Sequence, residues 1–191
     1  MQLLRFGRKD VLLMKTSLKV SLGGIVAALS IVLMFLTSVL PFGTYAFPLI
    51  SGVLLCVIVI EINYPWAFAT WFAVSALSFL VLADKEAALY YAAFFGIYPI
   101  IKSFIERLRS KVLQYLIKYA FFNVCMVAAF YIGIFLLSIP KESFYLFGLY
   151  LPWVFLIIGN LFFILYDICV TRLVTIYLIK WQKKTRKNTK L

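Results

Sequence analysis

The lysine and arginine residues of this chain are confined to a few short segments separated by long apolar runs. Of the 19 Lys and Arg residues, all but Lys85, Lys141 and Arg172 fall in three segments. These are an N-terminal group (Arg5, Arg8, Lys9, Lys15, Lys19), a central group (Lys102, Arg107, Arg109, Lys111, Lys118) and a C-terminal group (Lys180, Lys183, Lys184, Arg186, Lys187, Lys190). Because basic loops are retained in the cytoplasm, this alternation predicts a multi-pass protein of the cell membrane with both termini cytoplasmic.

The composition agrees with a membrane location. Apolar residues make up 65% of the chain and charged residues only 14%, and the mean hydropathy is +1.03, which is incompatible with an ordinary soluble surface. A helical span takes about 20 residues, so we predict an all-α integral membrane protein, a bundle of six transmembrane helices. The predicted parts are a basic cytoplasmic N-terminal segment (1–17), the membrane domain (18–180) and a basic cytoplasmic tail (181–191).

The net charge of +12 could indicate nucleic acid as a partner. The charges, however, cluster at the predicted membrane boundaries, where anionic lipids attract them. We therefore expect membrane lipids and no nucleic acid.

The apolar runs predict spans at 18–40, 48–62, 66–83, 87–101 and 119–139, and a sixth that starts between 146 and 152 and reaches 179. In the fourth span, Gly96 and Pro99 can kink the helix and free a carbonyl. Between the fourth and fifth spans, apolar residues recur at helical spacing among basic ones over 102–118. This pattern predicts a cytoplasmic amphipathic helix, either separate or an extension of the fourth span.

No apparatus for catalysis is visible in the sequence. It has no histidine, no carboxylate pair at helical spacing within a span and no glycine-rich phosphate loop. Cys56, Cys125 and Cys169 lack the CxxC spacing of a metal site. We predict a protein that is not an enzyme and that needs no metal and no cofactor.

Polar residues recur along one face of the sixth span. The face comprises Trp153, Ile157, Asn160, Ile164, Asp167 and Thr171, and it is expected to point into the bundle. A carboxylate at this depth costs about 2.5–3.5 kcal/mol, so Asp167 needs a partner, for which Asn123, Lys102 and Arg172 are candidates. Asp167 is either an interhelical clamp, which we favour, or a ligand or proton site. For Asn160, contact with a ligand and a structural role are equally compatible with the sequence.

Two further patterns have more than one interpretation. An aromatic stripe on the fourth span lies beneath the loop 84–86 and suits a ligand with a flat ring, or forms an interfacial belt; it comprises Tyr90, Tyr91, Phe94, Phe95 and Tyr98. Small residues on the first span allow another helix to approach closely, within the chain, which we favour, or from another subunit; they are Gly23, Gly24, Ala27 and Ala28.

The stretches 23–30 (GGIVAALS) and 47–52 (FPLISG), together with six spans in about 190 residues, resemble the S components of energy-coupling factor (ECF) vitamin transporters. The resemblance implies a vitamin-like ligand bound near the outer face, and a T component with two ATPase subunits as partners. By region, it implies ligand binding by Asp84, Lys85, Glu86, Tyr91, Trp153 and Asn160. It implies docking to the T component by Gly23, Gly24, Ala27 and Ala28.

Two other functions stay open. The chain could be a noncatalytic scaffold of a bacterial cell-envelope assembly, with no outer pocket. It could also be a membrane-embedded lipid-modifying enzyme, which requires polar groups to converge around Asp167 or Glu86. An importer subunit needs an outward-facing pocket between the fourth, fifth and sixth helices, whereas a scaffold is packed solid there.

Overall fold

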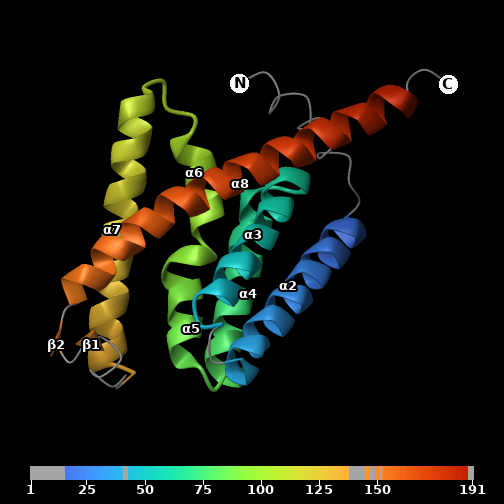
Figure 1. Ribbon diagram of the computed structural model, residues 1–191. Helices are drawn as coiled ribbons and strands as arrows, with labels where there is room; N and C mark the ends of the chain where they lie inside the picture. Colours follow the sequence, from blue (N-terminus) through green and yellow to red (C-terminus); the bar gives the residue numbers. More distant parts are fainter. Residues whose placement is uncertain (1–15, 41–42, 138–144, 147–148, 151, 189–191) are drawn as a thin grey trace.

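Apolar helices dominate the structure, a computed structural model that describes residues 16–40, 43–137, 145–146, 149–150 and 152–188 (Figure 1). The helices are α2 (Thr16–Val39), α3 (Ala46–Glu61), α4 (Tyr64–Val81), α5 (Lys85–Tyr90), η1 (Tyr91–Phe95, a π-helix), α6 (Tyr98–Ile105), α7 (Lys111–Phe135) and α8 (Pro152–Asn188). Two short antiparallel strands, β1 (Tyr145–Leu146) and β2 (Leu149–Tyr150), precede α8.

Within the described residues, five helical segments are long and apolar enough to cross a membrane. They are Thr16–Val39, Tyr64–Val81, Lys85–Ile105, Lys111–Phe135 and Leu156–Lys180, and α3 is a shorter apolar helix of 16 residues. These segments confirm the prediction of a predominantly helical, multi-pass membrane protein; the second of the six predicted spans corresponds to the shorter helix α3.

The helices run alternately up and down between two ends of the bundle (Figure 1). We call the end that carries the α3–α4 and α6–α7 turns the basic end, and the end that carries the α2–α3 and α4–α5 turns the far end. At the basic end, Asn63 caps α4 by accepting the Trp66 N–H at 3.2 Å, and Pro65 lies in the first turn of that helix. The break between the predicted spans 48–62 and 66–83 is therefore confirmed, with α4 beginning at Tyr64.

The fourth apolar segment is interrupted, as Gly96 predicts. The Gly96 N–H donates to the Tyr91 carbonyl at 2.8 Å, one residue further back than in an α-helix. This shift releases the Ala92 carbonyl, which accepts a hydrogen bond from Trp71 Nε1 at 3.2 Å. The π-helical turn is thus stabilised by a side chain of α4.

Pro99 contributes a second free carbonyl, because it has no N–H to donate to Phe95 four residues earlier. The Phe95 carbonyl instead accepts a hydrogen bond from the Tyr166 hydroxyl at 3.4 Å. It also faces Gly52 of α3 so closely that a Cβ at position 52 would collide with it. The interruption therefore brings Gly52 of α3 and Tyr166 of α8 against one backbone carbonyl that has no partner within its own helix.

The prediction of an amphipathic helix over 102–118 is wrong. α6 ends at Ile105 and α7 begins at Lys111, so the basic segment is divided among the end of α6, a break at 106–110 and the first two turns of α7. Ser110 caps α7 by accepting the Leu113 N–H at 3.5 Å, and Gln114 Nε2 donates to the Leu108 carbonyl at 2.7 Å. These side chains satisfy backbone groups at the break and stabilise a turn where a continuous helix was expected.

Two clusters form most of the core. One fills the space among α2, α3, α4 and the fourth segment; it comprises Val26, Met34, Leu55, Ile58, Ile62, Ala67, Val74, Leu82, Ala87, Tyr91 and Ile100. The other is largely aromatic and joins α3, η1, α6, α7 and α8; it comprises Cys56, Phe94, Tyr98, Phe122, Phe163, Tyr166 and Val170. The ring of Phe94 lies within 6.2 Å, centroid to centroid, of the rings of Tyr98, Phe122, Phe163 and Tyr166.

α8 runs obliquely to the other helices (Figure 1) and contacts mainly α7 and α3. Its predicted inward face is partly wrong, because Trp153 and Ile157 are 71% and 70% exposed. The buried line follows Phe163, Tyr166 and Val170. The oblique course explains the difference: the start of α8 lies beside α7 (Figure 1), and burial begins where the ring of Phe163 meets that of Tyr98 of α6.

Candidate functional site

The sequence marks Asp167 as a buried carboxylate that needs a partner, and the structure supplies three. The Tyr98 hydroxyl donates to Asp167 Oδ1 at 2.5 Å. The Lys102 ammonium group also contacts Oδ1, and Lys118 Nζ lies 3.1 Å from both carboxylate oxygens. Charged and polar groups from α6 and α7 thus converge on one residue of α8.

Glu106 completes this network. Its Oε1 atom lies 2.8 Å from both Lys102 Nζ and Lys118 Nζ. The two lysine side chains are only 5% exposed, whereas the Glu106 side chain is 39% exposed. Two cations and two anions therefore balance at the basic end, which satisfies the requirement that buried charges be paired.

Sequence reasoning found only part of this network. Lys102 was a candidate partner for Asp167, which the structure confirms, but Lys118, Glu106 and Tyr98 were not. The spacing of Tyr98, Lys102 and Glu106, at steps of four, could have indicated a shared polar face. Lys118 was not identified as a partner of Asp167, because the predicted fifth span begins at 119 and so leaves this lysine outside the membrane.

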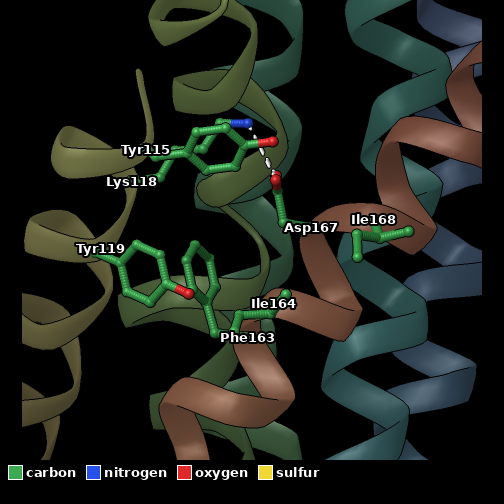
Figure 2. Close-up of a pocket in the computed structure, with 7 residues that line it drawn as sticks. All are labelled: Tyr115, Lys118, Tyr119, Phe163, Ile164, Asp167 and Ile168. Atoms are coloured by element: carbon green, nitrogen blue, oxygen red, sulfur yellow. Dashed lines mark hydrogen bonds and ion pairs between the residues drawn. The ribbon is translucent and has the colours of Figure 1, made fainter. Parts of the chain in front are cut away.

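A small hollow of about 80 Å³ opens beside the network, between α7 and α8 (Figure 2). Tyr115, Lys118 and Tyr119 line it from α7, and Phe163, Ile164, Asp167 and Ile168 line it from α8. Figure 2 shows the Lys118–Asp167 ion pair at one end of the hollow and the rings of Tyr119 and Phe163 at the other. The hollow thus combines a charged end with an apolar end.

Asn123 does not bind Asp167 but pairs with Asn160. Each amide donates to the other's oxygen at 3.0 Å, and each also donates to the carbonyl four residues earlier, Tyr119 for Asn123 and Leu156 for Asn160. Because both N–H groups of each amide are occupied, the pair acts as an interhelical clamp. Arg172, the other candidate partner for Asp167, is exposed.

The far end carries a second polar cluster. The Thr44 hydroxyl donates to Asp84 Oδ2 at 2.9 Å, and the hydroxyls of Tyr45 and Tyr90 donate to Glu86 Oε1 at 3.2 and 2.9 Å. Burial and the neighbouring Glu86 carboxylate raise the pKa of Tyr45 to about 12, so this phenol remains a donor at neutral pH. The two far-end turns are thereby tied together; we call these five residues the far-end cap.

The other predicted ligand-binding residues lie elsewhere. Lys85 donates to the Phe79 carbonyl at 2.6 Å. Tyr91 is fully buried in the core between α2, α3 and α4, and Trp153 is 71% exposed on α8. The structure therefore brings Asp84 and Glu86 together but places Tyr91, Trp153 and Asn160 at three separate positions.

The small residues of α2 divide between two faces. A Cβ at Gly23 would lie 3.7 Å from Thr70 Oγ1 of α4, and Ala27 packs against the core. A Cβ at Gly24 would meet nothing within 4 Å, and Ala28 is exposed. Half of the motif therefore packs internally, and half faces outward.

In the part of the chain that the structure describes, no three His, Cys, Asp or Glu side chains lie together in a way that could hold a metal ion. Comparisons of the chain with protein-family models, curated proteins and solved structures found no match.

Proposed function

We propose that this protein is the substrate-binding membrane subunit of a small-molecule importer of the ECF type. It binds a vitamin-like ligand at the far end, which the charge bias predicts to face outward. A T component and two ATPase subunits supply the energy for uptake. The observation that carries the proposal is the far-end cap.

The chemistry of the cap suits a ligand with a flat ring and N–H donors. Asp84 and Glu86 accept hydrogen bonds from hydroxyl groups, and no ion pair among the described residues neutralises either carboxylate. The rings of Tyr45 and Tyr90 lie beside them with centroids 5.1 Å apart. Aromatic surface beside carboxylates that carry no ion pair is a means of holding a planar, hydrogen-donating molecule.

Docking to a T component would use the outward face of α2. Gly24 and Ala28 lie one turn apart on an exposed surface, and small residues at this spacing let two helices approach closely in a membrane. Gly23 and Ala27 are already occupied by packing within the chain, so this proposal assigns docking to Gly24 and Ala28.

One observation favours the scaffold as a second candidate. The aromatic cluster around Phe94 fills the space between the fourth segment, α7 and α8 at mid-depth, where an importer subunit would need its pocket. On the scaffold hypothesis, the cap is a structural tie between two turns and holds no ligand.

The lipid-modifying enzyme requires polar groups to converge around Asp167, and the network at the basic end meets that condition. Each of its carboxylates is nevertheless bound by lysine ammonium groups. The carboxylate oxygens that the lysine ammonium groups contact are not free to accept a proton from a substrate. The network therefore favours structure over catalysis.

The test is native mass spectrometry of the protein purified in a mild detergent. We expect a stoichiometric vitamin-sized molecule to be retained by the wild type and lost from Glu86→Gln. Glu61→Gln removes a carboxylate at the basic end and serves as the matched control that keeps the ligand.

Copurification with coexpressed T component and ATPases tests the second half of the proposal. Gly24→Leu should abolish association while sparing ligand binding, and Gly23→Ala, on the inward face, should not. A protein that retains no small molecule and captures no such partner would refute the importer function and favour the scaffold.

A further inference from the structure

We propose that the groove between α7 and α8 at the basic end binds one anionic phospholipid from the adjacent membrane leaflet. The groove comprises the seven residues that line the hollow, and Lys111 of α7 and Arg172 of α8 each lie one helical turn beyond a lining residue. The phosphate lies between these two cations, and an acyl chain follows the apolar part of the hollow. This proposal does not depend on the importer function.

The apolar part of the groove is built for a hydrocarbon chain. Ile164 and Ile168 are 41% and 52% exposed, so their side chains form a surface that opens to the lipid. The rings of Tyr119 and Phe163 line the deeper end of the hollow. An acyl chain that lies in this hollow makes van der Waals contacts that the bulk lipid cannot make with a concave surface.

Two exposed cations, one on each helix of the groove, have no ion-pair partner among the described residues. Lys111 precedes Tyr115 by four residues and Arg172 follows Ile168 by four, so each lies one helical turn from a lining residue, on the same face. Both side chains are exposed, and no ion pair in the described ranges includes either. By contrast, Lys102 and Lys118 are already paired with Asp167 and Glu106.

The depth of these residues matches a lipid. α7 has 25 residues and is about 37 Å long, which exceeds the hydrocarbon core of about 30 Å. Its first turns, with Lys111, therefore reach the headgroup region, and Lys118 lies about 10 Å deeper along the axis. A lipid places its phosphate at the first level and its chains at the second, whereas a soluble anion would leave the apolar part empty.

The occupant is identified by charge and by apolar surface together. A zwitterionic lipid has the same acyl chains, but its headgroup also carries a cation, which the two basic side chains repel. An anionic lipid satisfies both parts of the groove, since basic pockets between membrane helices at the cytoplasmic side attract such headgroups. The site therefore selects phosphatidylglycerol-type lipids over phosphatidylcholine.

Native mass spectrometry with added lipid tests this assignment. The full chain in detergent is titrated with 1-palmitoyl-2-oleoyl phosphatidylglycerol or the corresponding phosphatidylcholine, and bound lipids are counted. We expect one phosphatidylglycerol to bind in preference. The double variant Lys111→Gln/Arg172→Gln should weaken its binding about thirtyfold, given the usual contribution of each basic residue near an anionic surface.

Two control variants separate the groove from general surface effects. Lys19→Gln removes a cation at the basic end of α2, and Leu165→Trp enlarges an exposed residue of α8 that does not line the hollow. Both should leave binding unchanged, whereas Ile168→Trp should fill the groove and abolish it. Far-UV circular dichroism shows whether each variant is folded.

Equal binding of the two lipids would overturn the proposal. So would an equal loss of phosphatidylglycerol in Lys19→Gln and in the double variant, because the effect would then be one of surface charge alone. Unchanged binding in a folded Ile168→Trp variant would show that the acyl chain lies elsewhere.

Discussion

Replacing Asp167 by asparagine should destabilise the bundle more than any other single change in the polar network. The substitution keeps the size of the side chain and its ability to accept from Tyr98. It removes the negative charge shared by Lys102 and Lys118, whose side chains are each 5% exposed. Only Glu106 then remains to balance two buried ammonium groups.

The magnitude follows from the cost of an unpaired buried charge. Removing one partner of a buried ion pair costs about 3–5 kcal/mol, and we expect Asp167→Asn to fall in this range. Lys118→Met should cost less, because it leaves the excess negative charge partly on Glu106, which is 39% exposed and can be hydrated. The free energy of unfolding is measured in mixed micelles by titration with a denaturing detergent, followed by circular dichroism.

The double variant Asp167→Asn/Lys118→Met is the decisive control. It restores charge balance, with Lys102 opposite Glu106, and should therefore be more stable than Asp167→Asn alone. Such a non-additive result is expected of residues in one network. If Asp167→Asn is as stable as the wild type, or if the double variant is less stable than either single one, the charge-balance argument is refuted.

Two further pairs of substitutions test other parts of the fold. Asn160→Ala should lower the free energy of unfolding by about 0.6–1.7 kcal/mol, the range of interhelical polar contacts in membranes. The further change Asn123→Ala should add little, because the amide pair is already broken. Full additivity of the two changes in a double-mutant cycle would contradict the clamp. Gly52→Ala should lower the melting temperature strongly, because the new Cβ collides with the Phe95 carbonyl. Gly24→Ala should be neutral or stabilising by about 0.5–1 kcal/mol, since its Cβ meets open space and alanine has the higher helix propensity. Similar melting temperatures for the two variants would count against the close approach of α3 to the fourth segment.

The sequence by itself determined that this protein consists of long apolar helices suited to a membrane, and it located those apolar runs, although not every helix end. Hydropathy is a local property, so the apolar runs mark the membrane segments without knowledge of their neighbours. Gly96 and Pro99 mark the interruption for the same reason, because the missing N–H and the shifted hydrogen bond act within one turn. The cost of a carboxylate at depth likewise requires Asp167 to have a partner, whatever the fold.

Which residue meets that need was decided only by the tertiary structure. Asn123, Lys102 and Arg172 were equally placed by depth, and the oblique course of α8 selected Lys102, together with Lys118, while it paired Asn123 with Asn160. The same course rotated the buried line of α8 toward Phe163 and away from Trp153. Helical spacing states which residues share a face, but the angle at which two helices cross states which of those faces meet, and that angle depends on the packing of the whole bundle.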